Sequence, residues 1–446
     1  MPRPLNRAID PRAEYDARLM DGIDAARLVR SGDLVLMPSS HQAPQILAAL
    51  AAREDELERV TIRSVVIPNM GWFREDAAKA WDLQVQFALA PDNRAALHDR
   101  LVDFHPFALV NQHKATDHRP EEGRPIDVLI LVVSPPDEHG YVCIGNACWD
   151  AVTCVQRAKR VLVEISPTTP RTCGDTMIHV SQIDAFVMGD RPRLASPDPD
   201  PVTFSDVDRR LAANVKQLVR DGDTVQLGLG SHTGALPLLG TFDDANDLGF
   251  FSELTVPGTV DLAERGIITS RQCEVHPDRF VASCMGNSPE DFEVIDGNPF
   301  YELYSYEHTN DPLVIARHDH MLTVNGALMV DLSGQIGVYA FGPSVYSGTG
   351  GQLAYHMGAY LSKQGRAVTV IPSTAKADTI SCIVPSFEKG QIVSIPREFA
   401  DTIVTDHGIA RLLGKSVRER AEELIAAAHP DHRDWLEQEA RRLYWP

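Results

Sequence analysis

Short, almost continuously apolar segments recur along the chain between stretches of helical pattern. Five of them are rich in β-branched residues and span Asp33–Met37, Val128–Ser134, Arg160–Ile165, Thr224–Gly228 and Ala367–Ile371. A strand with one solvated face alternates apolar and polar residues, whereas a strand that is buried on both faces does not. These segments therefore predict mainly parallel sheets covered by helices, and the fold class is α/β.

Three of these segments recur, with their flanking residues, in the same order in the second half of the chain. LVRSGDLVLMPSSH (28–41) aligns with LVRDGDTVQLGLGSH (218–232), VLILVVSPPDEHGYV (128–142) with MLTVNGALMVDLSGQIGV (321–338), and AKRVLVEISPTTPRT (158–172) with GRAVTVIPSTAKADT (365–379). Strand–turn–helix units resemble one another in general, but the shared order and the spacing of about 190 to 205 residues favour a diverged duplication. We expect two similar α/β domains.

A proline-rich segment separates the two halves. Residues 189–206 read GDRPRLASPDPDPVTFSD, and their prolines deny the backbone the hydrogen bonds of helices and interior strands. We place the linker here and expect one domain over residues 1–200 and a second over residues 201–446. Helical periodicity beyond Lys415, interrupted at Pro430, predicts terminal helices with a structural role.

Composition limits the classes of function. The 446 residues include 62 Asp and Glu against 42 Lys and Arg, and the formal net charge of -20 argues against a broad surface for nucleic acid or an anionic membrane. The 7 cysteines are scattered and odd in number, which is typical of the reducing cytoplasm rather than of a disulfide scaffold. No signal-peptide pattern and no run of ~18 apolar residues are present. We expect a soluble, cytoplasmic protein.

Two glycine-rich loops are candidates for ligand binding. They are GLGSHTG (228–234), which follows a predicted strand, and SGTGGQL (347–353). Glycines permit positive φ and let a ligand approach the backbone amides, which can hold an anion or a developing oxyanion. The first loop lacks the full spacing of a dinucleotide or phosphate-loop motif, and a tight turn without ligand is the commoner explanation for it. For the second loop, a plain loop and a ligand site explain the pattern equally well.

Two charged residues are further candidates. Glu253, in FFSELTVPGTVDLAERG (250–266), follows two phenylalanines, and desolvation there would make its carboxylate a better base or nucleophile. A helix cap or a surface position is the commoner role of an acidic residue. Lys376, in IPSTAK (371–376), follows a predicted strand and is suited to a phosphate or carboxylate, with a solvated surface lysine as the alternative.

The sequence offers no recognisable metal motif, and no metal is assigned. The candidate metal ligands are His318 with His320, His429 with His432, and Cys143, Cys148 and Cys154. They lack the spacing of known zinc motifs. A G-x-S-x-G elbow is also absent, which argues against Ser-His-Asp catalysis.

Taken together, the chain resembles the acetyl-CoA hydrolase/transferase family, which includes 4-hydroxybutyrate, succinyl and related acyl-CoA:carboxylate CoA-transferases. The matching stretches follow one another over most of the chain: 127–145, 170–184, 221–230, 251–266, 309–316, 324–335, 346–353, 371–385 and 404–433. The resemblance implies two α/β domains of the CoA-transferase-like fold, with the active site in the cleft between them.

The resemblance also implies the chemistry. Glu253 would be the catalytic nucleophile, which attacks an acyl-CoA carbonyl to give a mixed anhydride and is then captured by CoA as a glutamyl-CoA thioester. The acceptor carboxylate reverses these steps. The backbone amides of Leu229 and Gly351 are the implied oxyanion-hole donors. The implied CoA-binding residues are Gly228, Gly230, Asn310, Gly350 and Lys376.

The function that follows is an acyl-CoA:carboxylate CoA-transferase, with an acyl-CoA hydrolase as the alternative and a non-catalytic CoA-binding protein as a rival from another class. Coenzyme A is substrate and product, no tightly bound cofactor is expected, and the implied assembly is a homodimer or a dimer-based oligomer. Departures from the family pattern at Val256-Pro257-Gly258, Met329 and Ala354 leave the donor and acceptor open. The aromatic-rich segment 284–308 is either part of an acyl pocket or a solvated loop.

Overall fold

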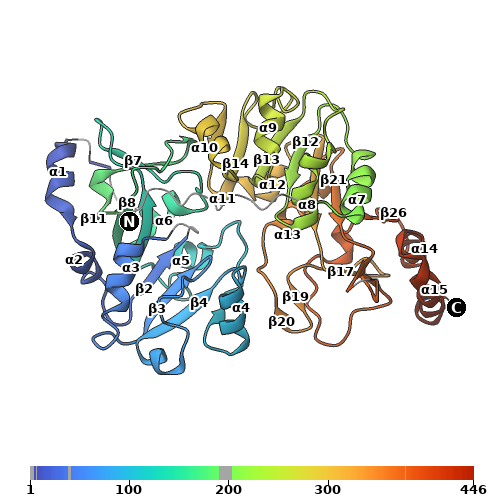
Figure 1. The fold of residues 1–446 in the computed structure, drawn as a ribbon, viewed down its shortest axis with the longest axis horizontal. Coiled ribbons are helices and arrows are strands. Elements are labelled where there is room, and N and C mark those ends of the chain that lie inside the picture. The colour runs from blue at the N-terminus through green and yellow to red at the C-terminus, as the bar shows by residue number, and fades with distance from the viewer. Residues whose placement is uncertain (1–4, 7, 39–41, 190–202, 377, 446) are drawn as a thin grey trace. The chain divides into compact units, whose positions relative to one another are not determined.

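The computed structural model describes residues 5–6, 8–38, 42–189, 203–376 and 378–445 (Figure 1). The chain divides into two compact units. The first contains residues 1–196, 283–285 and 292–307, and the second contains residues 197–282, 286–291 and 308–446. The expected linker, 189–206, lies for the greater part outside the described residues.

The first unit is built on a parallel eight-stranded sheet. Its strands, in spatial order, are β1 (Leu19–Met20), β11 (Ala185–Met188), β8 (Arg160–Ile165), β6 (Val128–Val133), β2 (Leu34–Met37), β3 (Val60–Ser64), β4 (Trp81–Val85) and β5 (Asp103–Phe104). Short pairs join β7 (Tyr141–Cys143) to β10 (Met177–His179) and β9 (Cys173–Gly174) to β15 (Tyr301–Leu303). The helices are α1 (Pro11–Arg18), α2 (Gly22–Ala26), α3 (Pro44–Ala51), α4 (Pro91–His98), α5 (Lys114–His118) and α6 (Ala151–Arg157).

The second unit has a sheet of the same kind. Its strands run in the order β26 (Gly408–Arg411), β25 (Thr402–Thr405), β21 (Arg366–Val370), β16 (Met321–Gly326), β12 (Thr224–Leu227) and β13 (Gly249–Leu254), followed by β14 (Phe280–Cys284), whose first three residues belong to this unit. From β25 to β13 all pairs are parallel, and β26 is antiparallel at the edge.

Helices and small strands complete the second unit. The helices are α7 (Asp206–Lys216), α8 (Ser231–Ala235), α9 (Thr259–Glu264), α12 (Pro312–Ile315), α13 (Gln352–Leu361), α14 (Val417–Ala427) and α15 (Pro430–Tyr444). The small strands are β17 (Met329–Asp331), β18 (Ile336–Gly337), β19 (Ala340–Phe341), β20 (Ser344–Val345), β22 (Thr374–Ala375), β23 (Ile380–Ser381) and β24 (Ile383–Val384). Two helices, α10 (Pro289–Ile295) and α11 (Tyr306–Thr309), contain residues of both units.

The two sheets share one strand order, as a duplication requires. The order β11-β8-β6-β2-β3 of the first unit corresponds to β25-β21-β16-β12-β13 of the second, and the three repeated sequence blocks fall on the paired strands β2 and β12, β6 and β16, and β8 and β21. The expectation of two similar α/β domains with mainly parallel sheets is therefore confirmed.

A buried ion pair is repeated with the fold. Arg160, the first residue of β8, pairs with Asp33 at 2.8 Å, and Arg366, the first residue of β21, pairs with Asp223. In each unit the same aspartate also accepts a 2.8 Å hydrogen bond from a backbone amide three residues earlier, that of Arg30 or Arg220. In the first unit the pair joins the start of β8 to the turn before β2, and in the second unit it joins the start of β21 to the turn before β12.

The sequence patterns predict these elements well. All five predicted strands are present, with ends that differ by one residue at most. Ser416 caps α14 with its side chain, and Pro430 is the first residue of α15, where the missing amide costs nothing. Apolar residues of both helices, among them Leu424, Ile425 and Leu436, join the core that contains Ile403 of β25. These terminal helices have the structural role that was predicted.

Among the described residues, no helix combines the length and the apolar character that crossing a bilayer requires. All seven cysteines lie in the described part of the chain and are free thiols. The aromatic-rich segment 284–308 is not a solvated loop, because it folds into α10, β15 and α11 and buries Tyr301 and Tyr306.

Candidate active site

Glu253 is the penultimate residue of β13, at the carboxyl end of a strand that lies between β12 and β14. The three residues before it, Phe250, Phe251 and Ser252, are fully buried, and Glu253 itself is partly buried. Loops that follow the carboxyl ends of parallel strands form the usual ligand site of such sheets. Glu253 is therefore neither a helix cap nor a surface carboxylate, and its position suits a reactive group.

Asn310 and Gly351 hold the carboxylate of Glu253. Asn310 Nδ2 donates a 2.7 Å hydrogen bond to Glu253 Oε2, and the backbone of Gly351 bonds to the same carboxylate. A Cβ atom on Gly351 would lie 2.1 Å from Oε2 and 2.2 Å from Asn310 Nδ2. Close packing therefore requires glycine at residue 351. Backbone conformation does not, since the φ of -89° suits any residue.

A chain of hydrogen bonds orients the amide of Asn310. The Thr309 hydroxyl donates to Asn310 Oδ1 at 2.9 Å, and the Tyr355 hydroxyl donates to the Thr309 carbonyl at 2.8 Å. All three residues are fully buried. Because Oδ1 accepts from Thr309, the amide nitrogen is the end that faces Glu253.

The electrostatic state of Glu253 follows from this setting. Desolvation raises the pKa of Glu253 from its ordinary 4.5 to about 7, and the hydrogen bonds from Asn310 and Gly351 oppose the rise. A carboxylate of raised pKa is a stronger base and nucleophile than one in water. At neutral pH the group is therefore divided between a reactive anion and a neutral acid.

The first glycine loop begins where β12 ends. The Gly228 amide donates to the Val324 carbonyl of β16 at 2.8 Å, and a Cβ atom on Gly228 would lie 2.3 Å from Asn325 Oδ1. Asn325 is fixed by two reciprocal amide hydrogen bonds with Gln226, of 3.0 and 2.8 Å. The loop is therefore held against β16 by a buried polar pair.

The rest of this loop is open to a ligand. The Leu229 side chain is 63% exposed, and no other described residue accepts a hydrogen bond from the Leu229 amide. Gly230 follows in extended backbone and precedes the first residue of α8. This geometry presents the Leu229 amide as an available donor, as an oxyanion site requires.

The second glycine loop leads into α13. Gly350 has a φ of +60°, which favours glycine, and Gly351 is the N-cap residue of α13. Lys376 is exposed in the turn between β22 and β23, and none of the contacts among the described residues joins it to Glu253. The structure thus assembles Glu253, Asn310 and Gly351 and leaves the proposed role of Lys376 a prediction.

Comparison with known proteins identifies the family. Residues 3–195 match the acetyl-CoA hydrolase/transferase N-terminal domain, and residues 288–440 match the acetyl-CoA hydrolase/transferase C-terminal domain. The chain belongs to the acetyl-CoA hydrolase/transferase family. The resemblance stated from the sequence is confirmed.

Relatives in this family cover nearly the whole chain. A succinyl-CoA:cyclohexane-1-carboxylate CoA transferase of Geobacter metallireducens is 34% identical over 96% of this chain and 96% of its own length. A 4-hydroxybutyrate coenzyme A transferase of Clostridium kluyveri is 36% identical over 73% of this chain and 74% of its own. The crystal structure of RipA from Yersinia pestis superposes with a TM-score of 0.88 at 29% identity, over 98% of this chain and 100% of that one.

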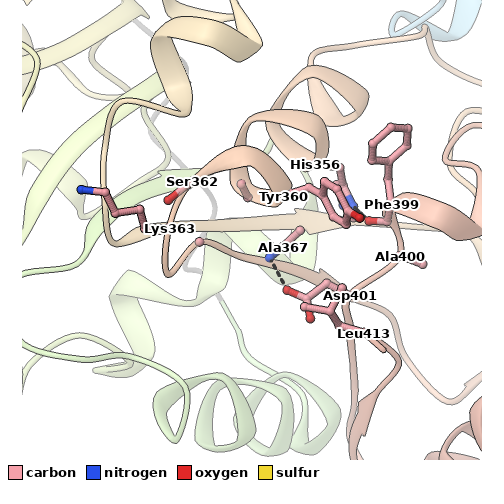
Figure 2. Close-up of a pocket in the computed structure, with 11 residues that line it drawn as sticks. His356, Tyr360, Ser362, Lys363, Ala367, Phe399, Ala400, Asp401 and Leu413 are labelled. Carbon is pink, nitrogen blue, oxygen red and sulfur yellow. Dashed lines mark hydrogen bonds between the residues drawn. The ribbon is translucent and has the colours of Figure 1, made fainter. Parts of the chain in front are cut away.

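A separate hollow in the second unit lies apart from Glu253. It has a volume of about 280 Å³ and lies along the second half of α13 and at the amino ends of β21 and β25. Figure 2 shows the Ala367 amide donating to Asp401 at this place. Gly351 lies at the opposite end of α13, which has 10 residues and is therefore about 15 Å long. The hollow and Glu253 are thus at opposite ends of one helix.

Sequence patterns missed the residues that support the site. These residues hydrogen-bond to one another, to Asn310 or to backbone groups, and none belongs to a sequence motif of its own: Gln226, Asn325, Thr309 and Tyr355. One signal was available, because Gln226 and Asn325 are polar residues inside otherwise apolar strands. A polar side chain at such a position must find a partner.

Proposed function

We propose that this protein is an acyl-CoA:carboxylate CoA-transferase that works through a covalent glutamyl-CoA thioester on Glu253. The observation that carries the proposal is the desolvated Glu253 carboxylate, held by Asn310 and Gly351 at the end of β13. The family supports the same reaction, because the relatives compared above are named as CoA transferases.

The hydrogen bonds give the two oxygens of the Glu253 carboxylate different roles. Oε2 accepts from Asn310, whereas no described side chain donates to Oε1. Oε1 is then the attacking atom. It forms a bond to the carbonyl carbon of the acyl-CoA, the C–S bond breaks, and the CoA thiolate leaves with the electron pair to give a mixed anhydride.

The second step uses the held oxygen. When the thiolate attacks the glutamyl carbon, negative charge develops on Oε2, which already faces Asn310 Nδ2 and packs against Gly351. The bond from the glutamyl carbon to Oε1 breaks, so the acyl group leaves as a free carboxylate and the glutamyl-CoA thioester remains. Gly351 would thus serve the oxyanion of the glutamyl carbon, and the Leu229 amide that of the acyl carbon.

The acceptor carboxylate runs the same steps in reverse. Both half-reactions exchange one carboxylate for another on CoA, so the energy of the thioester is conserved. Water must be kept from the anhydride and the thioester, because it would hydrolyse both. For this step the cleft between the two domains, which the family resemblance implies, remains part of the proposal.

CoA binding in so acidic a protein requires local donors. The proposed ones are the backbone of Gly230 and Gly350, the Asn310 amide and Lys376. Gly228 would allow close approach of the CoA rather than donate to it, because its amide already donates to the Val324 carbonyl. Backbone amides and a single lysine can hold phosphate and thioester groups without a basic surface. A homodimer or dimer-based assembly stays part of this proposal.

A CoA-exchange screen tests the function. The full chain is mixed with acetyl-, butyryl- or succinyl-CoA and isotopically labelled carboxylates, including 4-hydroxybutyrate and cyclohexane-1-carboxylate, and the CoA esters are followed by mass spectrometry. We expect a labelled acyl-CoA whose formation depends on the acceptor. Release of free CoA at a rate independent of any carboxylate would instead assign a hydrolase, and binding of CoA without any turnover would assign a non-catalytic protein.

A further inference from the structure

A buried polar cluster in the first unit is built from His113, Asp150 and Cys154. Asp150 Oδ2 lies 2.7 Å from His113 Nε2 and 3.1 Å from Cys154 Sγ, and Sγ lies 3.4 Å from Nε2. The three residues are 8%, 1% and 0% exposed. One ligand atom from each lies within 4.8 Å of the others. None of the three takes part in the hydrogen bonds that hold Glu253 and Asn310, and the steps proposed above make no use of them.

Local structure brings the three side chains together. Asp150 is the N-cap residue of α6, and Cys154 follows four residues later, so both lie on one side of the first turn. The Cys154 amide donates to the Asp150 carbonyl at 2.8 Å, which fixes this turn. His113 comes from a separate segment, as the residue before α5.

The two oxygens of the Asp150 carboxylate differ in their hydrogen-bond partners. Oδ2 is approached by His113, Cys154 and the Gln112 amide. Oδ1 is buried and has no hydrogen-bond partner. A buried carboxylate oxygen without a donor costs free energy, because it has lost its hydration and gained nothing in return. A cation bound at Oδ2 would stabilise the negative charge of this buried carboxylate, although Oδ1 itself would still have no hydrogen-bond donor.

We propose that His113, Asp150 and Cys154 bind a zinc ion. Imidazole, carboxylate and thiolate are the ligand types that zinc takes in proteins, whereas magnesium and calcium prefer sites made of oxygen alone. On binding, the Cys154 thiol releases its proton to solvent, and a zinc–sulfur bond forms. The two negative charges of thiolate and carboxylate then balance the charge of the ion, and His113 binds as the neutral imidazole.

The three ligand atoms can form three corners of a tetrahedral site after a small adjustment. With ordinary zinc–ligand bonds, ligand atoms lie roughly 3.3 to 3.5 Å apart. The separation of 3.4 Å between Cys154 Sγ and His113 Nε2 has this value. Asp150 Oδ2 would have to withdraw by roughly half an ångström, since its two contacts are 2.7 and 3.1 Å.

The surroundings suit a structural role. The Gln112 amide lies 3.3 Å from His113 Nε2 and also contacts the Tyr306 hydroxyl, which belongs to the segment 292–307. Tyr306 is 194 residues away from Gln112 in the chain. The ion would therefore stabilise the point at which this late segment joins the first unit. Sequence spacing did not reveal the set, because its members come from two segments and match no known motif.

Metal analysis of the full-length protein tests the proposal. The chain is stripped with a chelator, incubated with zinc chloride, desalted, and its zinc content is measured. We expect one zinc ion per chain, a higher melting temperature with zinc than without it, and an affinity at least roughly tenfold lower in Cys154→Ser. Cys148→Ser is the matched control, because Cys148 is equally buried but its Sγ contacts the Asp175 carbonyl at 3.3 Å instead.

Cobalt substitution keeps the test valid even when Cys154→Ser fails to fold. Cobalt(II) bound to the wild type should show ligand-field bands of tetrahedral intensity and a near-ultraviolet thiolate-to-cobalt band. Absence of zinc from the wild type, cobalt bound without the thiolate band, or equal zinc affinity in a folded Cys154→Ser variant would each overturn the proposal.

Discussion

Asn310 Nδ2 donates a 2.7 Å hydrogen bond to Glu253 Oε2, and Thr309 fixes the amide in this orientation by donating to Asn310 Oδ1. This relationship joins a strand end to the short segment between α11 and α12. The hydrogen bond fixes Glu253 Oε2 and leaves Oε1 as the proposed nucleophile. The predictions that follow depend on this pair and on the fold that positions it.

Asn310→Ala should lower kcat by roughly 10² to 10³, because it removes a donor from the charge that develops on Oε2. The substitution should also raise the pKa of Glu253, since the Asn310 hydrogen bond lowers it. The acidic limb of the pH–rate profile then moves to higher pH. Asn246→Ala, at an exposed asparagine of the second unit, is the control and should leave the profile unchanged. An unshifted limb in Asn310→Ala would contradict the assigned role.

Gly351→Ala should lower activity at least roughly 10²-fold, because the new methyl group would lie 2.1 Å from Glu253 Oε2 and displace it. The cost to the free energy of unfolding should be about 1 to 3 kcal/mol, as for other overpacked sites. Gly326→Ala is the matched control, since a Cβ there meets nothing within 4 Å. Steady-state rates and urea unfolding measure the two effects, and equal rates in both variants would refute the close packing.

The wild-type kcat/KM should fall as pH is lowered through about 7, because Glu253 must be ionised to attack and its pKa is raised to about 7 by desolvation. Below this pKa the neutral acid predominates, so the logarithm of the rate should fall by one unit for each pH unit. A profile measured with a fixed acyl-CoA checks this. A rate that stays constant down to pH 5 would exclude Glu253 as the titrating nucleophile.

Glu253→Gln should stabilise the protein at pH 8 and have little effect at pH 4. The folded-state pKa is raised from 4.5 to about 7, so the folded protein favours the protonated form. Ionisation therefore costs stability as pH rises from 4.5 through 7, by roughly 3 kcal/mol, and the neutral glutamine avoids this cost. Urea unfolding of both proteins at the two pH values measures the difference. Equal stability at pH 8 would argue that the carboxylate is solvated.

Asp223→Ala should destabilise the second unit by about 3 kcal/mol or more, because it leaves the guanidinium of Arg366 partly buried and unpaired. Removing the exposed partner of Arg265 in Asp243→Ala should cost about 1 kcal/mol or less. Unfolding by urea measures both. A similar cost for the two variants would contradict the structural role of the repeated ion pair.

Much of the fold could be predicted from the sequence. Continuous burial leaves a direct pattern in the five strands, and the duplication that aligns Asp33 with Asp223 recurs as one strand order in the two sheets. Helix boundaries could be predicted where a residue type determines them, as at Pro430, which begins α15.

The site was less accessible to sequence analysis. Glu253 became a strong candidate only through the family resemblance, because one glutamate after two phenylalanines can have many ordinary roles. Tyr355 and Thr309 meet through the packing of α13 against the α11–α12 segment, and Gln226 and Asn325 through the pairing of β12 with β16. Contacts of this kind depend on tertiary structure and leave no linear motif. The cytoplasmic location and the oligomeric state stay predictions.

Trapping of the glutamyl thioester distinguishes a covalent Glu253 intermediate from direct transfer. The wild type and Glu253→Gln are incubated with an acyl-CoA, treated with borohydride, digested and analysed by mass spectrometry. We expect that the wild-type peptide alone carries an alcohol in place of the Glu253 carboxyl group, and that it does so only after incubation with the acyl-CoA. An unmodified Glu253 peptide in the wild type, together with CoA transfer retained in Glu253→Gln, would contradict the covalent mechanism.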